Sequence, residues 1–422
     1  MWRPILDGPD RQRAEAALAA ITADLVALDV DWGHHGGVAP SGLNVGRTGV
    51  AVFLAYHANV SGRAREVDLA LDLLDRSIEE AMSRTPGLSL SDGLTGVAWA
   101  VSHLCGGMLP DQDGDPVAAV DHAVAELLAD DEWEVADELL YGLAGYGIWA
   151  LERLPAPVPA TVLERIVARL VRSAEVVDDV GVAWSTRSEW LSPEARIAHP
   201  TGRIDLGVAH GVTGIIGFLA RAVAAGIGGP PARDVLDRSV AWLLTQRAEG
   251  FGGSTMPPYV GFDLRGDSAR TAWCYGDLGV AAALLAAARN LHRADWEVEA
   301  VALARTAAAR DVGKMRLMGT GICHGTAGAA HLFHRMYQAT GDPELVRAAR
   351  RWFRRTLDER RPGAGVGGFG AHQATSDGGL RWWGSPALID GAAGVGLALL
   401  SGLEPVPPGW DRVLAVAVPV EG

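Results

Sequence analysis

The sequence has few of the residues that mark several large classes of protein. Only three cysteines are present, Cys105, Cys274 and Cys323, which is too few for a disulfide framework. Basic side chains are outnumbered, since 37 Lys and Arg stand against 51 Asp and Glu and the formal net charge is −14. Proteins that wrap nucleic acid need clustered basic side chains, so we expect no nucleic-acid partner.

Long apolar runs are also missing. No run reaches the roughly 18 residues that a membrane span needs. Residues 1–20 lack the apolar segment and the cleavage site of a secretory signal. The sequence therefore predicts a cytoplasmic protein that associates with a membrane only through its partners.

Glycine, in contrast, is abundant at 53 of 422 residues, and much of it belongs to a repeat. The pattern Gly-x-x-Gly opens an apolar segment seven times, at Gly46, Gly93, Gly142, Gly211, Gly276, Gly325 and Gly391. Helices that are apolar on all sides are buried. Amphipathic stretches with helical spacing alternate with these segments, and one of them has Val298, Val301 and Ala302 on its apolar face. No alternating run predicts a sheet.

Seven pairs of an amphipathic and a buried helix indicate a closed arrangement, because an open array would leave apolar ends. We therefore predict an all-α (α/α) toroid of seven outer-inner helical hairpins, forming a single domain over residues 1–422. Glycine, which has no Cβ, would let backbones approach closely where the inner helices begin. Long loops at about 177–209, 249–273 and 360–388 should crowd one rim and bring aromatic side chains there: Trp184, Trp190, Tyr259, Phe262, Trp382 and Trp383.

Sulfur and imidazole donors occur at one position of the repeat. Cys274 lies two residues before Gly276, and Cys323-His324 directly precede Gly325. Two thiolates and an imidazole are a ligand set for one zinc ion, and three protein ligands leave the fourth position open, as in catalytic sites. A thiolate-rich zinc favours a thiol substrate over water. The alternative is that both cysteines are buried packing residues, as we expect for Cys105.

Three motifs at these positions resemble the signatures of the lanthipeptide cyclases and LanC-like proteins. They are Leu206 to Gly211 (LGVAHG), Trp273 to Gly276 (WCYG) and Cys323 to Gly328 (CHGTAG). The resemblance covers nearly the whole chain, because all seven glycine repeats have counterparts. It implies a cyclase that adds peptide Cys thiols to dehydroalanine and dehydrobutyrine in a dehydrated precursor peptide, forming lanthionine and methyllanthionine rings. A dehydratase and an exporter are possible partners.

The resemblance also implies roles for single residues. Cys274, Cys323 and His324 would bind one zinc ion, His210 would supply or relay a proton, and Tyr275 and Arg270 would line the site. Michael addition produces an enolate, which needs an acid and a group that stabilises its oxygen; His210 and Arg270 suit these tasks. Alternatively, His210 is a helix cap or core histidine, Arg270 pairs with Asp267, and Tyr275 only packs.

One position departs from the bacterial pattern. Where many bacterial cyclases have an Asp that partners the catalytic His, this sequence has Glu138, with Asp137 before it. The segment Asp137 to Gly142 is more similar to the eukaryotic LanC-like motif. We expect Glu138 to orient His210, with Asp137 as second choice; both could also be acidic residues at a helix start.

Two other functions remain open. The chain could add glutathione or another small thiol to dehydroamino acids, as eukaryotic relatives do, or it could be a peptide-binding scaffold with a structural zinc. A third, weaker alternative is a glycosidase that uses Asp92 and Asp390 as its carboxylate pair. Helix capping explains these two residues adequately.

Overall fold

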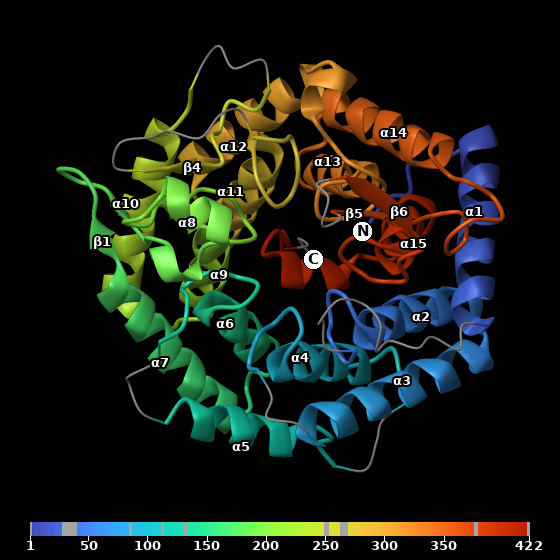
Figure 1. The fold of residues 1–422 in the computed structure, drawn as a ribbon, viewed down its shortest axis with the longest axis horizontal. Coiled ribbons are helices and arrows are strands. Elements are labelled where there is room, and N and C mark those ends of the chain that lie inside the picture. Colours follow the sequence, from blue (N-terminus) through green and yellow to red (C-terminus); the bar gives the residue numbers. More distant parts are fainter. Residues whose placement is uncertain are drawn as a thin grey trace. The chain divides into compact units, whose positions relative to one another are not determined.

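The computed structural model describes residues 2–27, 40–83, 87–110, 114–129, 134–248, 253–261, 269–374 and 379–419, which are mostly helical (Figure 1). These residues form two compact units. The first unit comprises Met1–Val124 and Leu317–Trp410, and the second comprises Ala125–Arg316 and Asp411–Glu421. The single domain that the sequence predicts stays a prediction.

The inner helices begin directly after the first glycine of each repeat, as predicted, and their residues are largely buried. In the first unit they are α2 (Arg47–Ser61), α4 (Leu94–Cys105), α13 (Thr326–Thr340) and α15 (Ala392–Leu403). In the second unit they are α6 (Leu143–Glu152), α9 (Val212–Ala224) and α11 (Asp277–Leu291).

The outer helices pair with the inner ones as hairpins, so that α11 packs on α12 and α13 on α14 (Figure 1). The first unit contains α1 (Gly8–Ala27), α3 (Ala64–Ser83) and α14 (Pro343–Asp358). The second contains α7 (Pro157–Ser173), α10 (Gly229–Thr245) and α12 (Ala294–Ala309), while α5 (Ala118–Leu127) spans the boundary between the units.

On α12 the sequence predicts the wrong buried face. Val298, expected in the core, is 67% exposed, and Ala302 is also exposed. The buried side chains are Trp296, Ala300, Leu303, Ala304, Ala307 and Ala308. Because α11 is itself rich in alanine, the two helices pack through small residues, and side-chain size does not mark the contact face.

The repeat glycines allow backbone segments to approach closely, as predicted, but the neighbouring atoms belong to the same loop and not to another helix. A Cβ at Gly211 would meet the carbonyl of Asp205, and one at Gly276 would meet the carbonyl of Arg270, in both cases six residues earlier. The second glycine of a repeat is confined in the same way, as Gly279 is by the Trp273 carbonyl. The loop before each inner helix therefore folds back on the first helical turn, and only glycine fits there.

Three short antiparallel ribbons lie in the long loops. They pair β1 (Glu175–Val176) with β2 (Val182–Ala183), β3 (Ile204–Asp205) with β4 (Tyr259–Val260), and β5 (Ala371–Ala374) with β6 (Leu380–Trp383). Short helices complete these segments and the ends of the units: η2 (Ser188–Trp190), α8 (Pro193–Ala198), η3 (Val312–Met315) and η4 (Gly409–Leu414). Strands of two to four residues are too short to produce an alternating pattern, which is why the sequence does not predict them.

One rim aromatic belongs to the core instead. Trp184 is 3% exposed, and its indole Nε1 donates a hydrogen bond to the Leu170 carbonyl at 3.0 Å. Phe262 and Asp267 lie outside the described residues.

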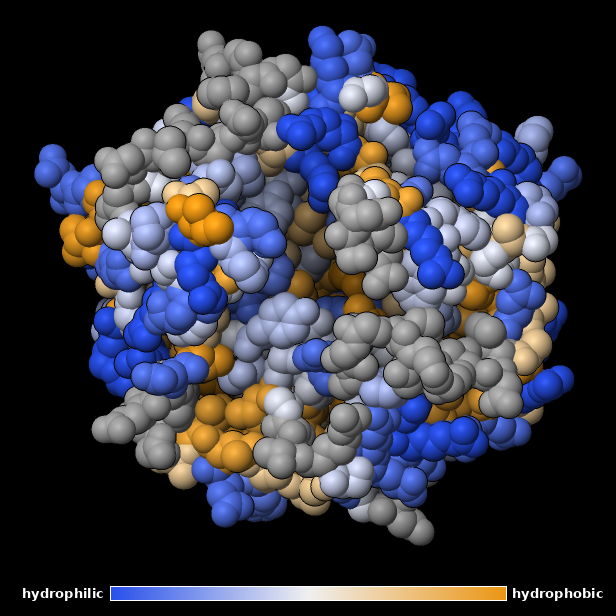
Figure 2. All heavy atoms as spheres, viewed as in Figure 1, coloured by the Kyte–Doolittle hydropathy of each residue, from blue (hydrophilic) through white to orange (hydrophobic). Residues whose placement is uncertain are grey.

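Figure 2 shows hydrophilic residues over much of the visible face, with hydrophobic residues in separate patches. Among the described helices, none combines the length and the apolar character needed to cross a bilayer.

Candidate functional site

His210 ends the loop that leads into α9, and a carboxylate fixes its ring. Its Nδ1 lies 2.7 Å from Glu138 Oε2. An ionised carboxylate only accepts hydrogen bonds, so Nδ1 carries the proton and donates it. The Glu138 carboxylate is held in turn by the backbone N–H groups of Leu140 at 3.1 Å and Tyr141 at 2.5 Å. The His210 side chain remains 39% exposed, so Nε2 is the atom suited to exchange a proton with a substrate.

Asp137, the second choice from the sequence, faces elsewhere. Its Oδ1 accepts a hydrogen bond from the Ser173 hydroxyl at 3.1 Å, at the end of α7. Burial raises the pKa of Asp137 to about 6, although the Ser173 hydrogen bond opposes this shift. The structure thus brings Glu138, and not Asp137, to His210.

The pKa of His210 is raised above its ordinary value of 6.5. Burial is the largest single influence and lowers the pKa, but the hydrogen bond that His210 donates to Glu138, the negative charge of Glu138, and the charges of Asp205 and Cys274 together outweigh burial. His210 therefore retains a proton at higher pH than a free imidazole would.

We expect Glu138→Gln to lower the pKa of His210, because it removes the charge that holds the proton. If His210 acts as an acid, activity falls as pH rises through its pKa, so the falling limb should move to lower pH. The pH profile of kcat/KM and an NMR titration of His210 measure the shift; a falling limb that stays at the wild-type pH would contradict the prediction.

The His210–Glu138 pair should also stabilise the wild-type fold. This contribution should be fully present below pH 6.5 and be lost as pH rises through the raised pKa of His210.

Cys274 and Tyr275 lie against the His210 loop within the second unit. Cys274 is 6% exposed, and its carbonyl accepts a hydrogen bond from the Ala209 N–H at 3.3 Å. A Cβ at Gly207 would meet this carbonyl at close range and the Tyr275 ring. The Tyr275 hydroxyl donates to Asp205 Oδ1 at 3.2 Å. Burial and the neighbouring Asp205 charge raise the pKa of Tyr275 well above 10, so it stays a neutral phenol.

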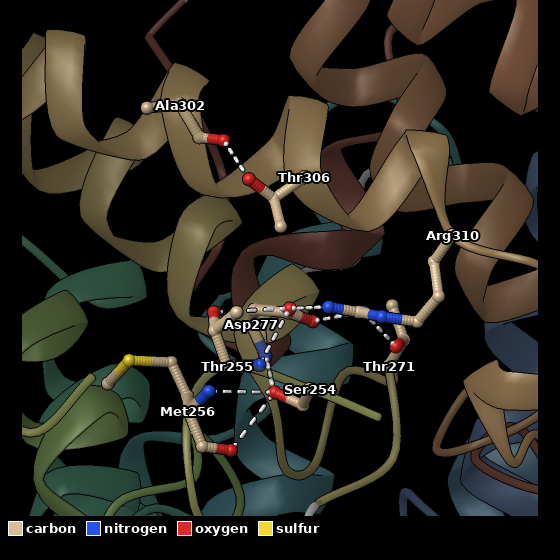
Figure 3. A network of polar contacts seen from close by, with 8 residues as sticks. All are labelled: Ser254, Thr255, Met256, Thr271, Asp277, Ala302, Thr306 and Arg310. Atoms are coloured by element: carbon tan, nitrogen blue, oxygen red, sulfur yellow. Dashed lines mark hydrogen bonds and ion pairs between the residues drawn. The ribbon is translucent and has the colours of Figure 1, made fainter. Parts of the chain in front are cut away.

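A buried ion pair anchors the segment that carries Cys274 (Figure 3). Asp277, the first residue of α11, is fully buried, and Arg310, at the end of α12, reaches both of its carboxylate oxygens, at 3.0 and 2.5 Å. Arg310 also donates to the Thr271 hydroxyl at 2.5 Å, and Ser254 Oγ accepts the Asp277 N–H at 2.8 Å. These contacts fix the chain on both sides of Cys274.

Arg310→Met should therefore destabilise the protein by about 3–5 kcal/mol, because it leaves the Asp277 carboxylate buried without its cation. Urea unfolding measures the change in free energy. Lys314→Met is a matched control, since Lys314 is 62% exposed and pairs with the exposed Asp311, and it should change stability by less than about 0.5 kcal/mol. Equal midpoints for the two variants would show that the buried pair does not stabilise the fold.

In the first unit, Cys323 and His324 line a cavity of about 30 Å³. The Cys323 N–H donates to the Ile389 carbonyl at 2.8 Å. The cavity wall also contains His372 and Asp390, and no motif in the sequence links these two residues to Cys323 and His324. Burial raises the pKa of Asp390, while a hydrogen bond from Ser385 and the positive charge of His324 oppose this shift.

Asp390 and Asp92 are not helix caps, contrary to expectation. The N-cap residues of α4 and α15 are Gly93 and Gly391, which have no side chain with which to cap the helix. Instead, Asp92 accepts a hydrogen bond from the Ser89 hydroxyl, and Asp390 accepts one from Ser385 at 3.1 Å. Each carboxylate therefore forms a hydrogen bond within its own loop, because a glycine of the Gly-x-x-Gly pattern already occupies the N-cap position.

Two further expectations concern Arg270 and Cys105. Arg270 is half-buried, and its carbonyl lies against Gly276; its suggested partner Asp267 is outside the described residues. Cys105, expected in the core, is only half-buried, because it is the last residue of α4 and lies beside the exposed loop that follows.

Two residues near His210 escaped the sequence analysis. Asp205 is 2% exposed and contacts Tyr275; its only sequence signal is that it lies six residues before Gly211, the position that folds back on the repeat glycine. Tyr141 is 50% exposed, and its ring stacks on the imidazole of His210 with centroids 6.0 Å apart and an angle of 10°. An exposed tyrosine carries no pattern that would single it out.

The three donors predicted for zinc occupy equivalent positions of their repeats. Cys274 belongs to the second unit, whereas Cys323 and His324 belong to the first. Two thiolates and an imidazole are soft and borderline donors, and their combined charge offsets that of Zn²⁺, so the chemistry of the set fits zinc.

Three comparisons with known proteins bear on family and fold. The family model described as lanthionine synthetase C-like protein matches residues 37–415. A protein of Danio rerio named glutathione S-transferase LANCL1 is 24% identical over 313 residues, which cover 72% of this chain and 71% of that protein. The solved structure of nisin cyclase matches with a TM-score of 0.71 at 17% identity, over 96% of this chain and 97% of that chain. The predicted fold class, an all-α (α/α) toroid, is confirmed by this structural match.

Proposed function

Because the chain belongs to the family of lanthionine synthetase C-like proteins, we propose that it is a zinc-dependent lanthipeptide cyclase. Its substrate would be a dehydrated precursor peptide, in which Cys thiols add to dehydroalanine or dehydrobutyrine to form thioether rings. The observation that carries this proposal is the His210–Glu138 pair, whose loop packs on the segment containing Cys274. A proton donor thus lies in the same unit as a thiolate suited to bind metal.

We propose Cys274, Cys323 and His324 as the ligands of one zinc ion. When bound there, zinc would lower the pKa of a substrate thiol, so that the thiol reacts as a thiolate. Cys323 and His324 are half-buried on a cavity wall, so their side chains are not sealed in the core.

The remaining chemistry depends on side chains of the protein. In the proposed reaction the substrate sulfur bonds to the β-carbon of the dehydroamino acid, and the electron pair of the alkene moves to the α-carbon and the carbonyl oxygen. His210 Nε2 would then protonate the α-carbon, while Glu138 stabilises the charged imidazole. The proton lost by the thiol replaces the proton that His210 gives up, so the ring product has the same mass as the linear peptide.

Arg270 is better suited than Tyr275 to stabilise the enolate oxygen. The Arg270 guanidinium could serve as the cation. Tyr275 already donates its hydroxyl proton to Asp205, so its oxygen is better suited to accept a hydrogen bond from the substrate.

We place this reaction in the cytoplasm, where cysteines stay reduced, with a dehydratase and an exporter as further partners. The proposal is tested by incubating the zinc-loaded protein with a dehydrated precursor peptide. Loss of free thiols without a change in mass is expected. Persistent thiols in the presence of a dehydrated peptide, with one zinc bound per chain, would overturn the proposal.

A second candidate is the addition of glutathione to dehydroamino acids, which the name of the Danio rerio relative favours. A competition experiment distinguishes the two, because glutathione addition raises the peptide mass by one glutathione, whereas cyclisation does not. A scaffold with structural zinc would change neither the thiols nor the mass.

A further inference from the structure

We propose that Asp205 is a positioning residue for this reaction: it holds the hydroxyl group of Tyr275 and thereby fixes the segment that carries Cys274. This inference rests on the proposed function. Asp205 lies on β3 and is 2% exposed. A carboxylate buried this deeply needs compensating partners, and its partners show what it does.

Among the described residues, three side chains bind the Asp205 carboxylate. Arg203 contacts both oxygens, with its Nε 3.2 Å from Oδ2 and its terminal nitrogen 3.0 Å from Oδ1. Thr186 donates to Oδ2 at 3.0 Å, and Tyr275 donates to Oδ1 at 3.2 Å. Arg203 balances the charge and Thr186 satisfies a lone pair, which leaves Tyr275 as the one partner that belongs to the predicted site.

The position of the carboxylate is itself fixed. Asp205 pairs with Tyr259 across the β3–β4 ribbon, and the Arg203 guanidinium stacks on the Tyr259 ring 4.3 Å from its centroid. The ring of His199 packs edge-on against the same tyrosine at 4.7 Å. Arg203 is therefore clamped between an aromatic face and a carboxylate, so Asp205 has little freedom to move.

The hydrogen bond at Tyr275 has a direction. The ionised carboxylate can only accept, so the phenol proton of Tyr275 points to Asp205 and its oxygen lone pair points away. The Tyr275 ring also lies over Gly207, where a Cβ would meet it. Asp205 and Gly207 thus hold both ends of the Tyr275 side chain, and the Cys274 carbonyl beside it receives the Ala209 N–H.

Removing the carboxylate charge should weaken the hydrogen bond from Tyr275, because a neutral amide oxygen is a poorer acceptor than a carboxylate. A double-mutant cycle with Asp205→Asn and Tyr275→Phe tests this, because residues that act through one contact show non-additive effects. We expect each single change to lower kcat by about tenfold, and the double variant to be no slower than the slower single variant. The inference is overturned if the two single reductions in kcat multiply in the double variant, or if Asp205→Asn has the wild-type kcat.

The matched control is Thr186→Val, which removes a hydrogen bond to the same carboxylate without touching Tyr275. It should leave kcat within about twofold of the wild type. If Asp205→Asn fails to fold in a thermal scan, Arg203→Lys replaces it in the cycle, because lysine keeps the charge but loses the two-point contact. The same non-additivity with Tyr275→Phe is then expected, and multiplying effects would again overturn the inference.

A spectroscopic measurement separates this inference from the proposed function. In zinc-loaded protein with 13C-labelled tyrosine and no substrate, the Cζ resonance of Tyr275 should shift in Asp205→Asn and stay unmoved in Thr186→Val. An unmoved resonance in Asp205→Asn overturns the positioning role even if the wild type cyclises peptides. A shifted resonance in a protein that does not cyclise peptides supports the contact while the proposed function fails.

Discussion

Replacing Cys323 with alanine is expected to abolish zinc binding and cyclisation together. The change removes one of two thiolates, leaving one thiolate and one imidazole to balance and hold the ion. Even outer-shell partners of a metal ligand contribute about 10- to 100-fold in affinity, so the loss of a direct ligand should exceed about 100-fold. Metal analysis after dialysis and thiol loss from a dehydrated peptide measure the two effects.

The control for this experiment is Cys105→Ala. Cys105 is half-buried at the end of α4, so its replacement has the same chemistry at a position outside the predicted ligand set. It should keep one zinc per chain and the wild-type rate. A Cys323→Ala protein that still contains stoichiometric zinc would rule out the proposed ligand set, whatever its activity.

Replacing His210 with asparagine is expected to slow cyclisation by about 10²- to 10⁴-fold, the usual contribution of a general acid or base, while zinc stays bound. Asparagine can keep a hydrogen bond to Glu138 but cannot supply a proton at neutral pH. Single-turnover rates with a dehydrated peptide, together with the zinc content, measure this effect.

His292→Asn is the matched control for His210. His292 is exposed and has a positive φ of 54°, a backbone conformation that asparagine tolerates. It should cyclise at the wild-type rate. If His210→Asn were equally fast, another group would have to protonate the α-carbon, and the role assigned to the His210–Glu138 pair would be wrong.

The two predictions separate two parts of the site. Cys323→Ala should remove the metal and the reaction, whereas His210→Asn should remove the reaction alone. If His210→Asn also lost zinc, His210 would be acting on the metal site and not as a proton donor. Measuring zinc content beside the rate is therefore essential to both experiments.

The fold was largely predictable from the sequence. The seven described inner helices all start at the residue after a repeat glycine, because backbone atoms of the preceding loop, such as the carbonyl six residues before Gly211 and Gly276, leave no room for a side chain there. A local steric requirement of this kind leaves a direct mark in the sequence. The buried face of α12 was predicted wrongly, since alanines that pack closely look the same as alanines that face solvent.

The sequence by itself determined where the inner helices begin and which donors precede them, because both depend on residue type at a fixed repeat position. Tertiary structure alone decided which side chains meet. Glu138 reaches His210 across 72 residues and Tyr275 reaches Asp205 across 70, and Asp277 pairs with Arg310 across 33. Neighbouring carboxylates such as Asp137 and Glu138 are chemically alike, and only the direction of each side chain in the folded chain distinguishes them.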